Sequence, residues 1–152
     1  MKDIVIVDID GTISKVGDRL KYLQQDEKDW DSFYEHCDED EPIKDVIDLV
    51  KYLDIQYEII FCTGRRESVR SKTKEWIGEH VYGHPMIHPN DSDLLMRKDG
   101  DFRHDTEIKP ELLKKAKIKL KDIAFVLEDR NSMVKKWRDM GLTCLQVNEG
   151  DF

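Results

Sequence analysis

The hydrophobic residues of this chain follow two alternating patterns. Short, nearly unbroken apolar runs, as expected of strands covered on both faces, occur at residues 4–7, 57–62, 94–96, 123–127 and 143–147. Between these runs, apolar side chains recur at helical spacing over residues 29–37, 43–54, 66–80, about 106–116 and 131–140. Strands that alternate with helices predict a parallel sheet with helices on both faces. We therefore expect one doubly wound, Rossmann-like α/β domain over residues 1–152.

Residues 15–41 interrupt this alternation soon after the first strand. The segment is polar, and only the short helix at 29–37 is expected within it. Trp30, Phe33 and Tyr34 have helical spacing there. Aromatic residues can stack on nucleobases, but at this spacing we favour packing. Pro42 follows an acidic cluster and suits the first position of the next helix.

The composition limits the possible partners and location of the protein. The net charge of −8 argues against a broad nucleic-acid footprint, although a few Lys and Arg can still bind a small phosphate group. The three cysteines show no metal-ligand spacing, and there is no P-loop for a nucleotide kinase. Without a signal peptide or a long apolar run, we expect a cytoplasmic protein with no membrane contact.

Two carboxylates follow the first strand directly. Asp8 and Asp10 are two residues apart in extended chain, so both can face one ligand at the edge where open α/β sheets bind ligands. Gly11 permits a sharp turn, and Thr12 adds a hydroxyl. Paired carboxylates repel each other unless a cation or a shared proton intervenes, and oxygen ligands suit Mg²⁺. The alternative is an ordinary polar turn, since Asp-Gly is common in turns.

Other strand ends carry polar signatures that can converge with this pair. Thr63, Gly64 and Arg65 follow the second strand, and Glu128 with Asp129 follows the fourth. Lys109 stands near the start of a helix, whose positive end would add to its own charge. Taken alone, each signature is more often a turn or a solvated lysine. Together they provide what phosphoryl transfer needs, namely a nucleophile, an acid or base, a metal site and cations.

The four signatures resemble, in order and spacing, the four motifs of the haloacid dehalogenase superfamily of phosphotransferases. The resemblance implies that Asp8 attacks phosphorus to form an aspartyl-phosphate and that Asp10 acts as the acid and then the base. An acid two residues after the nucleophile is the phosphatase pattern, so dehalogenation is set aside. Mg²⁺ would be held by Asp8, the backbone carbonyl of Asp10 and Asp129, with Glu128 beside them. The phosphoryl-binding group would comprise Thr12, Thr63, Gly64 and Lys109.

A narrower resemblance is to the 3′-phosphatase domain of bacteriophage polynucleotide kinase–phosphatases. It is carried by residues 128–130, 134, 137–138, 141, 144, 146–147 and 150–152. It implies that Arg19 binds substrate phosphate, that Arg65 is a second essential arginine and that Asp105 is a further required acid. Glu128 stands where the family has Asp, which leaves its role open. Residues 15–41 match the position of the cap that selects substrate, and this short cap implies an open site. With no kinase domain, a stand-alone phosphatase is expected.

The sequence leaves three possible functions for this protein. The first is a Mg²⁺-dependent phosphomonoesterase that removes 3′-phosphates from nucleic-acid ends or nucleotides, with a role in nucleic-acid repair. The phage resemblance would place it in the cytoplasm of a host cell. The second is a 5′-phosphatase of small nucleotides, which the net acidity favours. The third is a non-catalytic phosphate-binding module, against which the intact motifs argue. The choice between DNA and RNA and the oligomeric state stay open.

Overall fold

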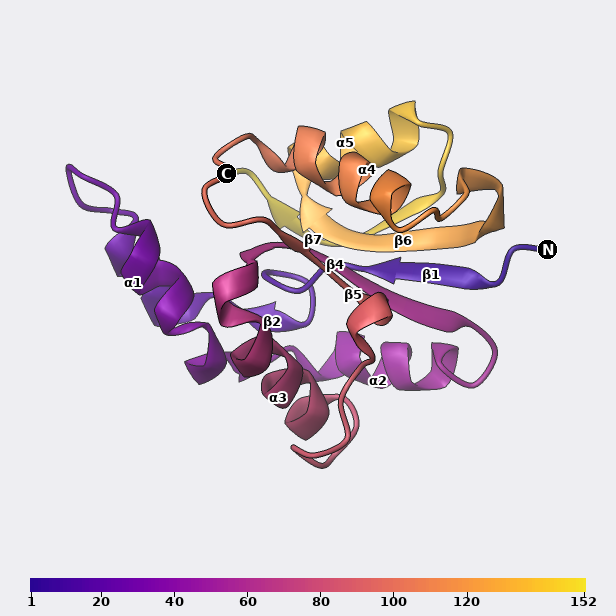
Figure 1. Ribbon diagram of the computed structural model, residues 1–152, viewed down its shortest axis with the longest axis horizontal. Coiled ribbons are helices and arrows are strands. Elements are labelled where there is room, and N and C mark those ends of the chain that lie inside the picture. Colours follow the sequence, from indigo (N-terminus) through magenta and orange to yellow (C-terminus); the bar gives the residue numbers. More distant parts are fainter.

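A computed structural model describes all residues from 1 to 152 (Figure 1). Its centre is a five-stranded sheet in the order β5-β4-β1-β6-β7, in which every neighbouring pair is parallel. The strands are β1 (Ile4–Val7), β4 (Glu58–Arg66), β5 (Leu94–Arg97), β6 (Ile123–Arg130) and β7 (Cys144–Gly150). The five strands correspond to the five apolar runs, so the predicted doubly wound α/β fold is confirmed.

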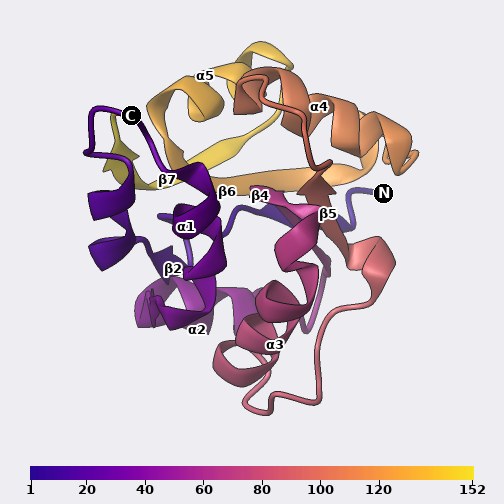
Figure 2. The ribbon, with the colours of Figure 1, turned by 60° about the vertical axis from the view of Figure 1, so that its left-hand side comes forward.

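Helices cover both faces of the sheet, as Figures 1 and 2 show. One face carries α2 (Lys44–Leu53) and α3 (Arg70–His80), and the other carries α4 (Asp105–Lys115) and α5 (Asn131–Asp139). Successive side chains of β1 point to opposite faces. Val5 and Val7 belong to the core shared with α2 and α3, whereas Ile6 belongs to the core shared with α4 and α5. This arrangement explains why β1 is apolar at every position.

Two strands extend further than the apolar pattern predicts. Thr63 to Arg66 lie within β4, and Glu128 to Arg130 lie within β6. Both strands have a register irregularity near these ends, between Thr63 and Arg66 and between Glu128 and Arg130. A hydrophobicity pattern does not detect these strand ends, because their residues are mostly polar.

A short antiparallel pair closes the segment that follows β1. β2 (Ser14–Lys15) pairs with β3 (Glu41–Pro42), and the backbone N–H of Ile43 donates to the carbonyl of Ile13 at 2.7 Å. The prediction that Pro42 begins a helix is wrong: it lies in β3, and α2 begins at Lys44. Proline is tolerated in such an edge strand because the missing N–H is not needed there.

The enclosed segment is helical. It contains a 3-10 helix over Gly17–Tyr22, α1 (Trp30–Glu35) and a 3-10 turn over Cys37–Glu39. The predicted helix at 29–37 is therefore shorter, because Asp29 caps α1 by accepting from the backbone N–H of Ser32. In Figure 1, α1 lies on the side of the molecule toward which the arrow of β1 points. No helix of this chain is both long and apolar enough to cross a membrane.

Candidate active site

Asp8 lies at the carboxyl end of β1, where it is almost fully buried. Its Oδ1 accepts a hydrogen bond from Nζ of Lys109 at 2.7 Å, and its Oδ2 accepts one from the hydroxyl of Thr12 at 2.9 Å. Lys109 reaches this point from the second turn of α4. Both carboxylate oxygens of Asp8 are thus held in a defined orientation at the bottom of the site.

Two further carboxylates join Asp8. Oxygen atoms of Asp8, Glu128 and Asp129 lie within 4.8 Å of one another, and all three residues are buried. Burial and the negative charge of Asp8 raise the pKa of both Glu128 and Asp129. Burial opposes the charge of Lys109, but the charges of Asp8 and Glu128 outweigh it and raise its pKa well above the usual range. Lys109, which bonds to Asp8 and Glu128, is thus the one cation paired with this cluster of three acidic residues.

This cluster of buried acidic side chains can hold a divalent cation. Carboxylate oxygens are the donors that Mg²⁺ prefers, and a cation would relieve their mutual repulsion. Of the four predicted metal-site residues, the structure brings Asp8, Glu128 and Asp129 together. The side chain of the fourth, Asp10, points elsewhere and is held by arginines.

Glu128, whose role the sequence leaves open, is enclosed by donors. Its Oε2 accepts from Lys109 at 2.8 Å and from the indole N–H of Trp137 at 3.4 Å. Its Oε1 accepts from the backbone N–H of Asp129 at 3.2 Å. Glu128 therefore positions Lys109 and Asp129 in addition to contributing charge.

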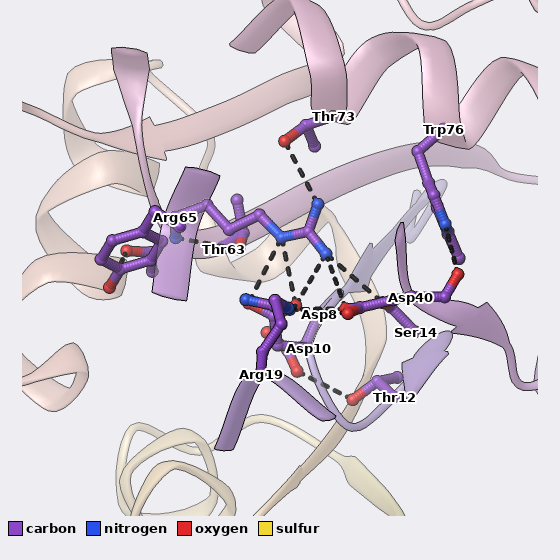
Figure 3. A network of polar contacts seen from close by, with 12 residues as sticks. Asp8, Asp10, Thr12, Ser14, Arg19, Asp40, Thr63, Arg65, Thr73 and Trp76 are labelled. Carbon is purple, nitrogen blue, oxygen red and sulfur yellow. Dashed lines mark hydrogen bonds and ion pairs between the residues drawn. The ribbon is translucent and has the colours of Figure 1, made fainter. Parts of the chain in front are cut away.

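Asp10 belongs to a separate network, drawn in Figure 3. Its Oδ1 accepts from Nη2 of Arg65 at 2.7 Å and from Nη2 of Arg19 at 2.8 Å. Burial opposes ionisation of Asp10, but the charges of Arg65 and Arg19 outweigh it and hold its pKa well below the usual range. In this structure Asp10 is a carboxylate whose charge is shared by two guanidinium groups.

Asp40 completes this network and was not singled out by the sequence. It accepts hydrogen bonds from Nε and Nη2 of Arg19 and from the hydroxyl of Ser14 (Figure 3). Its backbone carbonyl accepts from the indole N–H of Trp76 at 2.8 Å. Asp40 is one of four consecutive acidic residues, and only its burial distinguishes it from the others. No local signal in the sequence could have identified it.

Asp105, at the start of α4, organises a third group of charges. It accepts from Nη2 of Arg97 and, at 3.0 Å, from Nη1 of Arg130. Arg97 also donates to the carbonyl of Gly64 at 2.9 Å. A Cβ on Gly64 would lie 2.6 Å from Oδ1 of Asp105, so only glycine permits this approach. Sequence reasoning left Arg130 without a role at the site.

These groups surround a cleft of about 810 Å³. Of the predicted site residues, the structure places the following along it: Asp8, Asp10, Thr63, Gly64, Asp105, Lys109, Glu128 and Asp129. Thr12, Arg19 and Arg65 do not line the cleft. Thr12 donates to Asp8 and Asp129, and the two arginines lie buried behind Asp10. The structure thus brings all the predicted residues into one region. Thr12, Arg19 and Arg65, however, contact other side chains of the site and not the open cleft.

Comparisons with known proteins show which family this chain is similar to. A family model described as the polynucleotide kinase phosphatase domain matches residues 2–152. One similar structure, from a Pnkp1/Rnl/Hen1 complex, is 31% identical with a TM-score of 0.79. All of this chain and 48% of that chain are covered. Another, from the Pnkp1/Rnl/Hen1 RNA repair complex, is 32% identical with a TM-score of 0.80, and 44% of that chain is covered. This chain therefore spans just under half the length of these two proteins.

More distant structures share the fold. CbbY from Rhodobacter sphaeroides, solved in complex with phosphate, is 14% identical with a TM-score of 0.59, and 100% of this chain and 88% of that one are covered. A haloacid dehalogenase-like hydrolase from Streptococcus pneumoniae is 12% identical, also with a TM-score of 0.59, and the match covers 95% of this chain and 83% of that one. The match over nearly the whole chain and the convergence of the four motifs lead to one conclusion: this protein belongs to the phosphatase-domain family of the polynucleotide kinase–phosphatases, within the haloacid dehalogenase superfamily.

Proposed function

We propose that this phosphatase is a Mg²⁺-dependent 3′-phosphatase that acts on nucleic-acid ends or nucleotides and works through an aspartyl-phosphate. The observation that carries the proposal is the pair of carboxylates at the end of β1, which have opposite surroundings. Asp8 lies 2.7 Å from the ammonium of Lys109 and beside two further carboxylates, whereas Asp10 is held by two arginines. Two acids in contrasting environments can take two different chemical roles.

In the first step, a carboxylate oxygen of Asp8 attacks phosphorus as the bond from phosphorus to the leaving oxygen breaks. The ammonium of Lys109, which donates to Oδ1 of Asp8 at 2.7 Å, orients this carboxylate and offsets charge on the phosphoryl oxygens. Asp8, Asp129 and the backbone carbonyl of Asp10 would hold Mg²⁺, with Glu128 beside them. When bound, the ion would neutralise the acidic cluster and the phosphoryl group.

Asp10 supplies the proton that the leaving oxygen takes up. In the free protein the two guanidinium groups hold Asp10 as a carboxylate, so it must first take up a proton from water. The negative charge of a phosphate bound in the cleft would raise the proton affinity of Asp10, which takes up this proton and passes it to the leaving oxygen. In the second step, Asp10 accepts a proton from the water that hydrolyses the aspartyl-phosphate, which restores Asp8 and releases phosphate.

Action on nucleic-acid ends is supported by the family match and by two relatives, one of which is described as part of an RNA repair complex, and the preference for a 3′-phosphate follows from the motif resemblance. The test is phosphate release with Mg²⁺ from four substrates: a 3′-phosphorylated oligonucleotide, its 5′-phosphorylated twin, and the 3′- and 5′-mononucleotides. We expect preference for both 3′-phosphates. Preference for 5′-mononucleotides would replace the proposal with a small-nucleotide phosphatase.

Asp8→Asn is the control for the chemistry, because it keeps the shape of the side chain and removes the nucleophile. We expect hydrolysis to fall at least about 10³-fold, in the range seen when a nucleophile is removed. Hydrolysis that is unchanged in Asp8→Asn would overturn the nucleophile assignment. Binding of phosphate or Mg²⁺ by the wild type without turnover would instead indicate a non-catalytic module.

A further inference from the structure

Trp30, Phe33 and Tyr34, in and around α1, differ in how deeply they are buried. Phe33 is buried, and its ring packs against the guanidinium of Arg19 at 4.4 Å, as the packing interpretation predicts. Trp30 is 36% exposed and Tyr34 is half-buried, and both line the cleft. For these two residues, packing against the core is an incomplete explanation.

Trp30 and Tyr34 belong to a larger surface at the mouth of the cleft. We call it the rim platform and define it as Trp30, Tyr34, Arg66 and Phe102. The rings of Trp30 and Tyr34 are stacked, with centroids 6.0 Å apart and planes 25° apart. The guanidinium of Arg66 lies 4.9 Å from the ring of Tyr34 and 5.6 Å from the ring of Phe102. Three separate segments of the chain thus form one row of aromatic rings, in which the guanidinium of Arg66 lies between Tyr34 and Phe102.

The rim platform is fixed beside the reaction centre. The hydroxyl of Tyr34 donates to the carbonyl of Gly64 at 3.3 Å, and Gly64 follows Thr63 in the second motif. All four platform residues line the same cleft as Asp8. A molecule whose phosphate lies at Asp8 would therefore extend along the rim platform as it leaves the cleft.

The platform has unused binding capacity. Phe102 is 79% exposed, so most of its side chain is accessible to a ligand. The reaction derived above uses none of the four residues. Flat aromatic faces with interleaved guanidinium groups are the surfaces on which unpaired nucleobases stack. The net charge of −8 disfavours a long electrostatic track, so local stacking is the mode of binding that suits this protein.

We propose that the rim platform binds the nucleobases of a single strand whose 3′-phosphate lies at Asp8. The platform would thereby favour the end of a strand over a free mononucleotide. This proposal rests on the 3′-phosphatase function proposed above and adds the substrate class to it. Paired bases already stack on their neighbours, so an unpaired end gains most from these aromatic faces.

The experiment compares kcat/KM for a single-stranded 3′-phosphorylated hexanucleotide with kcat/KM for the 3′-mononucleotide. DNA and RNA forms are both measured, and the faster one is used for the variants. In Trp30→Ala and in Phe102→Ala we expect the oligonucleotide-to-mononucleotide ratio to fall about 5- to 100-fold, mainly through KM, since stacking on one aromatic residue contributes that much. Trp30→Phe keeps an aromatic face and should restore most of the ratio.

Tyr52→Ala is the matched control. Tyr52 is an aromatic residue on α2 that is 74% exposed and does not line the cleft, so the ratio should stay at the wild-type value. Equal ratios in the wild type, Trp30→Ala, Phe102→Ala and Tyr52→Ala would overturn the role of the platform and leave the 3′-phosphatase proposal intact. A wild type that releases no phosphate from either 3′-substrate would overturn both.

Tryptophan fluorescence gives a readout that is independent of turnover. Trp76 and Trp137 are buried, so Trp30 is the tryptophan that a bound base can reach. In Asp8→Asn, which we expect to bind substrate with little hydrolysis, the hexanucleotide should quench the emission and the 3′-mononucleotide should quench it less. The same titration of Asp8→Asn combined with Trp30→Phe should show no quenching. Quenching that persists without Trp30 would contradict the proposed stacking.

Discussion

The backbone at Gly11 lies directly against the carboxylate of Asp129. A Cβ at residue 11 would be 2.6 Å from Cγ of Asp129 and closer still to its Oδ2, and the φ of Gly11 is +84°. Gly11→Ala should therefore displace Asp129 from the acidic cluster. We expect the rate of phosphate release to fall at least tenfold and the midpoint for activation by Mg²⁺ to shift to higher concentration.

Gly141→Ala is the control for Gly11→Ala. Gly141 has a φ of +85°, but no atom lies within 4 Å of its Cβ position. Both variants should lose about 1–2 kcal/mol of stability from the left-handed conformation, and only Gly11→Ala should lose activity. Equal activity in the two variants would show that the close approach to Asp129 has no consequence for the reaction.

The second prediction concerns the ammonium of Lys109, which lies 2.7 Å from Asp8 and 2.8 Å from Glu128. Lys109→Met leaves three buried carboxylates without their cation. In EDTA at neutral pH, the free energy of unfolding should fall by about 3–5 kcal/mol. Added Mg²⁺ should recover part of the loss, because a bound cation stabilises the folded state. Urea unfolding measures the loss of stability and its recovery by Mg²⁺. Lys114→Met, at an exposed lysine of the same helix, is the control. A loss of the same size in Lys114→Met would contradict the prediction.

The third prediction is the pH dependence of stability in EDTA. Burial and neighbouring charge raise the pKa of Glu128 and Asp129 above the values near 4 expected in the unfolded chain. Between those values and the raised ones, the folded protein binds more protons than the unfolded chain, so stability falls as pH rises. We expect a decline of more than ~1 kcal/mol between about pH 5 and pH 8.

The decline should become smaller in saturating Mg²⁺ and in Glu128→Gln, which removes one of the coupled charges. Urea unfolding at a series of pH values measures it. A stability that rises over this range in EDTA would mean that the acidic cluster does not raise these pKa values in the folded protein.

The fourth prediction tests Asp40. Asp40→Asn keeps the size of the side chain but removes its negative charge and one of the two oxygens that accept from Arg19, which leaves Asp10 as the one carboxylate paired with that guanidinium. We expect a loss of about 2 kcal/mol in stability, in the range for hydrogen bonds to charged groups. We also expect lower kcat/KM, because Arg19 is no longer fixed beside Asp10. The neighbouring Glu41→Gln, whose side chain is 80% exposed, should change neither quantity.

Local patterns were sufficient to predict the fold. Each strand of the sheet contains a short apolar run, which distinguishes it in the sequence from the helices with their periodic apolar residues. β1 is apolar throughout because it is buried on both faces. The boundaries were less predictable. Thr63 and Glu128 continue their strands although they are polar, and Pro42 lies in a strand because of its pairing with Ser14. Pairing with a distant segment overrode the local preference in each case.

The sequence by itself determined which side chains gather at the site. Asp8, Asp10, Thr63 and Asp129 follow or end parallel strands, and parallel strands bring their carboxyl ends to one edge. Only the tertiary structure decided how the charges are paired. In the folded protein, Lys109 bonds to both Asp8 and Glu128. Arg19 and Arg65 both donate to Asp10. Of four consecutive acidic residues, Asp40 is the one that is buried against Arg19. Ion pairing depends on distance and burial, and residues far apart in the chain acquire these only when they pack together.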